Sequence, residues 1–263
     1  MRILDLDLDF FLDGVAHDLP YDAPRLDPID YPPWERDAAI AFLEQNCMLT
    51  SKLPGFVVER HGQLFPRWRD AIEEGKLVLP FEVTHVDAHA DLGLGDHGYV
   101  YFMTELLFAP VEERRFPMIG EGGMDDGNWL NFAIACRWLS DLLYVFNRET
   151  DTPGDLLGYV LEGFDGDAEH IQLAALNDTE IKKLWFRPEK WPVPQRLEPK
   201  VPFKALPWKS FQASEPYDVV CLARSPAFTP VESDVLFDEI RARYIDETAF
   251  PRVADSARPS RAW

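Results

Sequence analysis

The sequence predicts an α/β protein in which helices cover both faces of a mainly parallel sheet, as in a three-layer sandwich. Short apolar runs typical of buried strands recur along the 263 residues, and stretches with helical spacing of apolar residues separate several of them. No repeat at a fixed period can be aligned, which argues against solenoids and propellers. We expect one domain over residues 1–250 and a loosely held polar tail over residues 251–263.

The expected strands are the apolar runs at residues 3–11, 56–58, 77–86, 142–146, 171–176 and 219–222. The clearest helix covers residues 34–47, because two prolines precede it and apolar residues then recur at helical spacing. Further helices are expected at residues 65–74, 129–139 and 233–244, and in the last of these an apolar stripe predicts core packing by Val235, Leu236, Ile240 and Tyr244. Loops rich in proline and glycine fill residues 12–33, 119–128 and 186–208.

The charge of the chain restricts its partners. The formal net charge is -20, from 46 acidic and 26 basic residues, so the mean surface field repels phosphate and we expect no nucleic-acid partner. An acidic surface suits a cationic substrate, although solubility alone also accounts for it. The three cysteines lack the spacing of zinc or redox sites, and no apolar leader or run of about 20 apolar residues is present. We therefore expect a cytoplasmic protein without a membrane span.

The strongest chemical signal lies at residues 84–92, where Asp87, His89 and Asp91 stand at alternate positions directly after an apolar run. Extended backbone would place the three on one face, at the carboxyl end of a strand, where α/β sheets place active sites. One such residue alone would be explained equally well by a capped turn. Two buried carboxylates this close repel each other unless a cation compensates them, and carboxylate with imidazole suits manganese, iron or zinc.

A second acidic stripe occupies residues 4–11, where Asp5, Asp7 and Asp9 alternate with apolar residues. The alternation fits either metal ligands or the solvated face of an edge strand, and the bulky apolar residues opposite favour a packed strand. We expect Asp7 and Asp9, nearest the carboxyl end, to be the ligands and Asp5 to lie deeper. His61 follows the run at 56–58, and its metal role depends on the other two motifs, because a lone histidine there is more often a surface or capping residue.

These residues carry a resemblance. The run Asp87-Ala88-His89-Ala90-Asp91 resembles the DAHxD motif of the arginase, agmatinase and deacetylase superfamily, and Asp7-Leu8-Asp9 resembles its DxD motif. Residues 4–11, 57–61 and 85–91, with 126–130 and 225–230, are more similar still to an arginase-like family that includes bacterial peptide arginases. The resemblance covers most of residues 1–245. It implies an arginase-like catalytic domain with a rearranged strand order, because the DxD motif precedes the DAHxD motif here and follows it in ordinary arginases.

The resemblance also implies a site with two Mn²⁺ ions, one held by His61, Asp87, Asp91 and Asp7, the other by Asp87, His89, Asp7 and Asp9. Asp87 and Asp7 would bridge the two ions, which would activate water for attack on a guanidinium carbon and release urea. A proton donor and a carboxylate partner for the guanidinium are also needed. His97 is either that donor or a bystander, and the carboxylate candidates are Glu59 and Glu44.

Two departures from ordinary arginases bear on the substrate. Glu59-Arg60-His61-Gly62 replaces GGDHS, and Leu92-Gly93 replaces a pair ending in the asparagine that helps to hold a free amino acid. Gly93 would leave room for a peptide backbone. Residues 119–128, with Asn128, and residues 186–208 would line the groove, and the nearby tryptophans either contact the substrate or pack ordinarily, namely Trp185, Trp191 and Trp208.

We therefore expect a peptide arginase that converts arginine residues of a partner peptide to ornithine residues and urea. Three alternatives remain open. Two are enzymes, a ureohydrolase of free arginine or agmatine and an amide deacetylase. The third is a non-catalytic, metal-stabilised peptide-binding protein that keeps the fold and the site.

Overall fold

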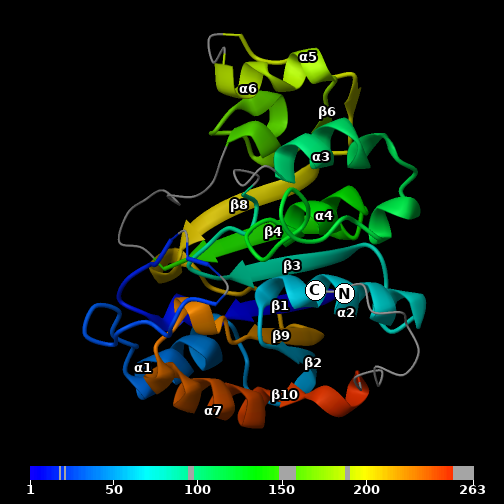
Figure 1. Ribbon diagram of the computed structural model, residues 1–263. Helices are drawn as coiled ribbons and strands as arrows, with labels where there is room; N and C mark the ends of the chain where they lie inside the picture. Colours follow the sequence, from blue (N-terminus) through cyan, green and yellow to red (C-terminus); the bar gives the residue numbers. More distant parts are fainter. Residues whose placement is uncertain (18, 21, 94–97, 148–157, 187–189, 251–263) are drawn as a thin grey trace.

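The fold is built on one eight-stranded sheet with the strand order β10-β2-β9-β1-β3-β4-β8-β5. The computed structural model describes residues 1–17, 19–20, 22–93, 98–147, 158–186 and 190–250. Every neighbouring pair in the sheet is parallel except β5 and β8. Figure 1 shows the strands stacked from β8 to β10. The predicted α/β fold with a mainly parallel sheet is thus confirmed, and residues 251–263 lie outside the described part of the chain.

The strands are short and mostly buried. Those of the main sheet are β1 (Arg2–Asp7), β2 (Leu53–Val58), β3 (Phe81–Val86), β4 (Leu139–Phe146), β5 (His170–Ile171), β8 (Val201–Pro207), β9 (Val219–Ala223) and β10 (Ile245–Asp246). A separate antiparallel pair consists of β6 (Ala174–Ala175) and β7 (Arg196–Leu197). It lies with the helices α5 (Asp178–Ile181) and α6 (Lys183–Phe186) beyond β8, at the top of Figure 1. The expected strand at 171–176 is therefore two short strands.

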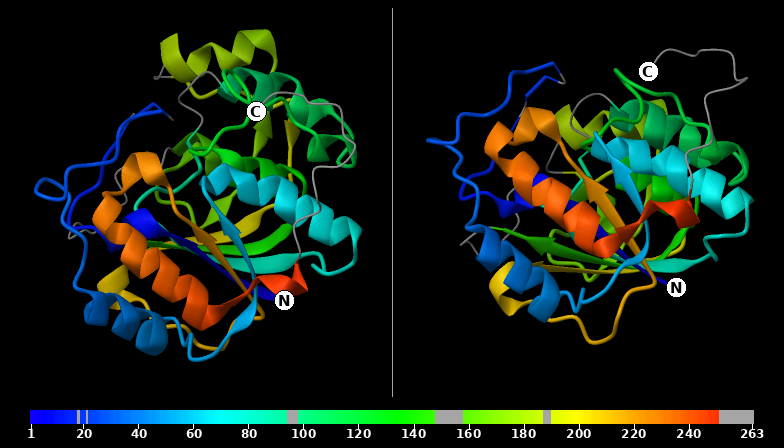
Figure 2. Two further views of the ribbon diagram at one scale, coloured as in Figure 1. Left: turned by 60° about the horizontal axis from the view of Figure 1, so that its bottom comes forward. Right: turned by 90° about the horizontal axis from the view of Figure 1, so that it is seen from below.

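Helices cover both faces of the main sheet. One face packs against α2 (Leu64–Glu73), α3 (Gly98–Thr104) and α4 (Trp129–Ala135). The other packs against α1 (Arg36–Ala41), the π-helical turn η2 (Phe42–Asn46) that continues it, and α7 (Asp234–Tyr244). Figure 2 shows α1 and α7 side by side. The remaining helices are 3-10 turns, namely η1 (Leu8–Phe11), η3 (His61–Gln63), η4 (Leu106–Phe108), η5 (Glu113–Arg115), η6 (Gly158–Val160), η7 (Glu162–Phe164), η8 (Trp208–Ser210), η9 (Pro226–Phe228), η10 (Val231–Ser233) and η11 (Glu247–Ala249).

The pleat of the strands sends alternate side chains into two cores. In β1, Ile3 enters the core under α2 and α4, whereas Leu4 and Leu6 enter the core under α1 and α7. Asp5 therefore points towards α2 and α4, although it stands in a buried strand. The expected stripe on α7 was wrong in one member, since Val235 is 69% exposed and Phe237 takes its place in the core.

Strands β2 and β9 approach each other closely at Gly55. A Cβ atom at this position would lie 2.1 Å from the carbonyl oxygen of Val220 and 2.9 Å from the side chain of Ile245. Only glycine fits this contact. Among the described residues, no helix is both long enough and apolar enough to cross a membrane.

The carboxyl ends of two strands matter for the site, and beyond each the backbone is not extended as the sequence suggests. β1 stops at Asp7 and continues as the 3-10 turn η1, so the expected strand at 3–11 is wrong beyond Asp7. β3 stops at Val86, and residues 87–91 bend instead of extending. Asp87, His89 and Asp91 therefore do not lie on one face of a strand, and their convergence needs another explanation.

Candidate metal centre

A buried cluster of carboxylates and imidazoles lies at the carboxyl ends of four neighbouring parallel strands, β2, β9, β1 and β3. All six residues predicted as metal ligands lie in it: Asp7, Asp9, His61, Asp87, His89 and Asp91. Four further residues join them, and they had no assigned role in the sequence: Asp5, His85, Trp129 and Ser225. The arrangement follows the general tendency of parallel sheets to place sites at this edge.

The two acidic motifs reach the cluster through the same local turn. The Oδ1 atom of Asp7 accepts a hydrogen bond from the backbone N–H of Asp9 at 3.1 Å, and Oδ1 of Asp87 accepts one from the N–H of His89 at 2.7 Å. Aspartate favours such turns because its side chain can satisfy a backbone donor two residues on. An aspartate thus stands at the end of β1 and directly after β3, and its turn brings the next ligand back over the sheet. This turn replaces the extended backbone that we expected.

His61 Nδ1 marks the best candidate position for a cation. It lies 3.0 Å from Asp7 Oδ2, 2.9 Å from Asp87 Oδ2 and 3.1 Å from Asp91 Oδ2. Despite these distances it is a buried nitrogen with no properly aligned hydrogen bond among the described residues. Three carboxylate oxygens and one imidazole nitrogen therefore converge without satisfying one another. A divalent cation would satisfy all four, and this donor set suits manganese, iron or zinc.

In His61 and His89 the hydrogen bonds of Nε2 determine which ring nitrogen faces the carboxylates. His89 Nε2 lies 2.7 Å from the carbonyl oxygen of Ala16, and because a carbonyl only accepts, Nε2 must carry the proton. His61 Nε2 lies 3.1 Å from both oxygens of Asp5, which act as acceptors in the same way. Both histidines consequently turn Nδ1 towards the carboxylates, as carboxylate–histidine–metal triads do.

Asp87 lies between two halves of the cluster. Its Oδ2 faces His61 Nδ1 at 2.9 Å, and its Oδ1 faces His89 Nδ1 at 3.8 Å. His89 Nδ1 also lies 2.9 Å from Asp9 Oδ2. One half therefore combines Asp7, His61 and Asp87, the other combines Asp9, Asp87 and His89, and the two share one carboxylate.

Asp5 and His85 form a deeper tier under the first half. Asp5 is fully buried, and its carboxylate contacts His61 Nε2 and, at 2.8 Å, His85 Nδ1. His85 Nε2 reaches the carbonyl oxygen of His89 at 3.1 Å, so both ring nitrogens of His85 are used inside the protein. Asp5 thus lies deeper than Asp7 and Asp9, as expected, and it holds the ring of His61 in place.

Burial and neighbouring charges together shift the pKa values of the carboxylates, upwards for Asp7 and Asp87 and downwards for Asp5. Burial, with the charge of Asp9, raises the pKa of Asp7 from 3.8 to about 6. Burial also raises the pKa of Asp87 well above its ordinary value, and the charges of Asp9 and Asp7 add to this effect. For Asp5, burial acts in the same sense, but His61 and His85 outweigh it and lower the pKa to about 2. Two of the carboxylates are therefore strained as anions without a cation.

The two histidines respond to the same field. Burial opposes a charge on His61, yet the carboxylates of Asp5 and Asp91 raise its pKa well above the ordinary value. Burial likewise opposes a charge on His89, and Asp9 outweighs it, so this pKa is also raised well above the ordinary value. In the absence of metal the site attracts protons, and a divalent cation would compete for the same place.

Trp129 and Ser225 hold two of the carboxylates from outside. The indole Nε1–H of Trp129 donates to Asp91 Oδ2 at 2.7 Å, and the hydroxyl of Ser225 donates to Asp7 Oδ2. Asp91 and Ser225 both have positive φ, 51° and 46°. This backbone conformation is uncommon outside glycine and often occurs at functional sites, where the surroundings must enforce it.

The open side of the cluster is at His89. Its side chain is 19% exposed, compared with 3% for His61. Two rings flank it edge to face, His17 at 5.2 Å and Phe228 at 5.2 Å between centroids. A molecule that approaches the cluster from this side would pass His17 and Phe228, beside the segment that carries Ala16.

The other residues predicted from the sequence lie in different surroundings. Glu59 is near the cluster at the end of β2, but its side chain is 57% exposed and lies 3.3 Å from Arg224 Nε. Glu44 accepts a hydrogen bond from Tyr244, which precedes β10 at the opposite, amino end of β2. The structure thus separates Glu44 from the cluster. His97 lies outside the described residues.

Gly93 and Asn128 have structural contacts of their own. The N–H of Gly93 donates to the carbonyl of Gly127 at 3.0 Å, and a Cβ on Gly93 would lie 3.2 Å from the same oxygen. This glycine therefore allows two loops to pack, and the room expected for a peptide backbone is filled by Gly127. Asn128 is fully buried and bonds to Asp125 N and Gly123 O, so its polar atoms hold the loop before α4.

Two comparisons with known proteins gave no further guide to this cluster. A scan of the chain against models of protein families found no match. A search of the curated proteins found no match either. The chemistry of the site is therefore argued from its own residues.

Proposed function

We propose that this protein is a dinuclear manganese hydrolase that cleaves the guanidinium group of arginine residues in a peptide, giving ornithine residues and urea. The observation that carries the proposal is the sharing of Asp87 between two ligand groups, with one oxygen towards each histidine. A carboxylate placed in this way can bridge two cations. When bound, a pair of manganese ions would activate water for attack at neutral pH.

The protein's own residues supply orientation and charge. Asp5 and the carbonyl of Ala16 fix the two histidine rings, and Trp129 fixes Asp91. Two divalent cations would balance the charge of the four ligand carboxylates, so a guanidinium that enters past His89 still needs an anionic partner of its own. The remaining requirement is a proton donor for the leaving amine, and His97 stays the candidate that the sequence offers.

Two contacts favour a peptide over free arginine. The position after the DAHAD run, where free-arginine enzymes hold the amino acid, is occupied here by internal bonds. Leu92 O accepts from Asn131 Nδ2 at 2.8 Å, and Gly93 N donates to Gly127 O. Neither backbone group is left to bind the α-amino or α-carboxylate group of a free amino acid. An arginine within a peptide has no such charged groups and does not need them.

The proposal is tested by metal analysis, a urea assay and mass spectrometry on the same preparation. Protein loaded with manganese is incubated with arginine-containing peptides, a peptide with an acetylated lysine, free arginine and agmatine. We expect urea from the peptides. Each converted arginine should lower the mass of its peptide by the mass of one urea minus that of the water consumed. Urea from agmatine or arginine alone would favour the small-molecule enzyme, release of an acyl group without urea would favour the deacetylase, and bound metal without turnover would favour the binding protein.

Matched variants connect the reaction to the site. Asp87→Ala should abolish urea release, because it removes the ligand common to both groups. Asp37→Asn, which changes a side chain that is 97% exposed on α1, should retain full activity. Undiminished turnover in Asp87→Ala would show that the reaction occurs elsewhere.

A further inference from the structure

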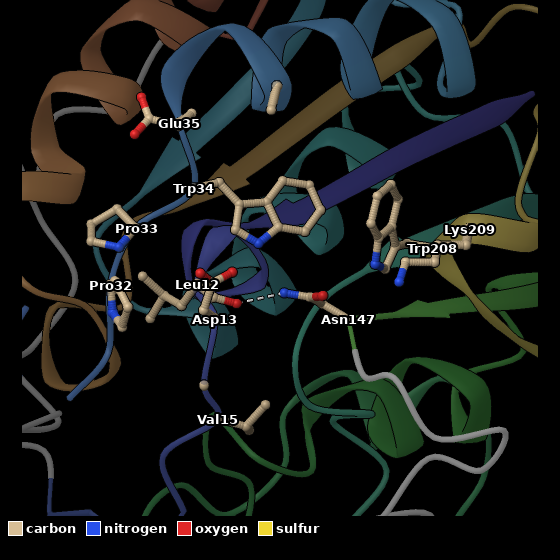
Figure 3. A pocket seen from close by; sticks show the side chains of 12 residues that line it. Leu12, Asp13, Val15, Pro32, Pro33, Trp34, Glu35, Asn147, Trp208 and Lys209 are labelled. Carbon is tan, nitrogen blue, oxygen red and sulfur yellow. Dashed lines mark hydrogen bonds between the residues drawn. The ribbon is translucent and has the colours of Figure 1, made fainter. Parts of the chain in front are cut away.

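A second feature of the carboxyl edge is an open cleft of about 890 Å³, which we call the tryptophan cleft. Figure 3 shows its walls, which come from the segments after β1, before α1, after β4 and after β8. The residues used below are Asp13, Trp34, Glu35, Asn147 and Trp208; the ammonium of Lys209, which also lines the cleft, lies 5.7 Å from the centre of the Trp208 ring. None of the functional groups of the metal cluster is needed to form it.

The floor of the cleft is aromatic and firmly supported. The rings of Trp34 and Trp208 pack at 4.9 Å between centroids, and Phe42 backs both of them at 6.3 and 6.0 Å. Asn147 Nδ2 donates to the carbonyls of Phe10 and Leu12 at 2.6 Å each, which fixes the turn after β1. A preformed aromatic surface of this kind costs little conformational entropy when a ligand binds.

The polar groups of the cleft select the kind of ligand. Neither indole N–H of the tryptophan pair is hydrogen-bonded to another described residue, so both can donate to carbonyl oxygens of a ligand. Asp13 and Glu35 are exposed and form no ion pair with other described residues, which leaves two carboxylates for a cation. Indole donors beside aromatic and proline surfaces, with acidic residues at the rim, suit an extended peptide that carries a basic residue.

The cleft adjoins the open side of the metal cluster. Its wall includes Gly14 and Val15, and the next residue, Ala16, accepts the hydrogen bond of His89 Nε2. His17 then packs against the ring of His89. One continuous segment therefore forms the wall of the cleft and the rim of the cluster, so a chain bound in the first would lead into the second.

We propose that the tryptophan cleft binds the segment of the substrate peptide that flanks the reacting arginine, with a second basic side chain paired to Asp13 and Glu35. This inference rests on the proposed function for its substrate. The indole N–H groups donate to backbone carbonyls of the segment, and apolar or proline side chains lie on the rings. Recognition by the cleft would add to the affinity of the arginine side chain for the cluster, where the side chain of His89 is only 19% exposed.

The test uses the full, manganese-loaded protein and two sets of peptides. The first set carries one arginine and a Pro-Lys-Pro segment placed two to eight residues to either side, with Gly-Ser-Gly at the same places as the control. The second set replaces the arginine by glutamine and carries a fluorescein label, so binding is measured by anisotropy without turnover. Urea release gives kcat and KM for the first set.

The expected result is a preference of about tenfold in KM, with unchanged kcat, for Pro-Lys-Pro at its best spacing. Asp13→Asn and Glu35→Gln should each weaken binding of the labelled peptide by about two- to fivefold at low salt, the range for exposed ion pairs, and by less at high salt. Trp208→Phe should weaken it too, since the ring stays and the donor is lost. Asp37→Asn, a charge change of the same size on α1, should leave binding unchanged.

The outcomes separate this inference from the proposed function. Equal KM values for all spacings, with variants that bind like the wild type, would overturn the role of the cleft and leave the peptide arginase standing. If the labelled peptides show a binding preference for Pro-Lys-Pro that the variants lose, but no peptide gives urea, the role of the cleft is upheld and the proposed reaction is overturned. A dimer in sedimentation that Trp208→Ala dissociates would place a second copy of the chain in the cleft and refute the proposal.

Discussion

Replacing Asp7 by asparagine should stabilise the metal-free protein while it destroys the metal site. Burial and Asp9 raise the pKa of this carboxyl from 3.8 to about 6, so at neutral pH the folded state holds an anion that it disfavours. At about 1.36 kcal/mol per pKa unit, the difference corresponds to about 3 kcal/mol of lost stability. An asparagine side chain of similar shape would remove this cost: its Oδ1 can still accept from the N–H of Asp9, and its Nδ2 would face the hydroxyl of Ser225, which can accept as well as donate.

The pH dependence follows from the direction of the shift. A carboxyl whose pKa is raised on folding favours the folded state below its unfolded pKa of 3.8, and this advantage is lost as the pH rises through about 6. The gap between Asp7→Asn and wild type should therefore be about 3 kcal/mol above pH 7 and close as the pH falls towards 4.

Excess manganese should reverse the order of stability, so that wild type becomes more stable than Asp7→Asn. A ligand at about 1,000 times its Kd adds about 4 kcal/mol to the state that binds it. Wild type would gain this and Asp7→Asn would not. Guanidinium unfolding, followed by tryptophan fluorescence with chelator or with manganese, measures both orders, and Asp37→Asn serves as the neutral control. An Asp7→Asn protein that is no more stable than wild type in chelator at pH 7.5 would refute the reasoning.

Three further predictions concern the supports of the site and the sheet. Asp5→Asn should leave every ligand of the cluster in place but weaken manganese binding about 10- to 100-fold, because His61 loses its charged partner; competition with a chelator measures this, and unchanged affinity would contradict it. Trp129→Phe should weaken manganese binding by about tenfold, because the hydrogen bond to Asp91 is lost. The control Trp138→Phe removes an equally buried indole N–H that has no partner among the described residues, and it should leave the affinity for manganese unchanged. Equal effects of the two variants on this affinity would argue against the bond. Gly55→Ala should cost about 3 kcal/mol or prevent folding, because its Cβ would meet the Val220 carbonyl at 2.1 Å, and a thermal unfolding midpoint like that of wild type would disprove this close approach.

The sequence predicted where the site lies in the sheet better than it predicted the backbone turns that bring the ligands together. Acidic motifs after apolar runs predict ligands at the carboxyl edge of a parallel sheet, and the structure places Asp7 and Asp87 there. The run Leu8–Phe11 looks like more strand because apolar residues flank Asp9 in it, yet Asp7 caps a turn there. A DxD or DxH motif at the end of a strand could have suggested that turn, since aspartate often accepts from the residue two positions on.

Other parts of the site depend on pairing that no local pattern contains. Asp5 and His85 meet because β1 and β3 pair in a register that sets these two residues side by side. A shift of one residue would have sent one of them to the opposite face. Trp129 and Ser225 reach the carboxylates from segments distant in the chain, and neither residue type signals such a role.

The short edges of the sheet limit how this protein can hold an extended chain. The outermost strands, β10 and β5, have two residues each, so the described sheet ends without a long row of free backbone donors and acceptors. A peptide could not readily bind here by adding itself as another strand, the mode in which main-chain bonds provide most of the affinity. Discrimination among peptides would then be expected to follow their side chains, and it should be sensitive to single residues near the modified position.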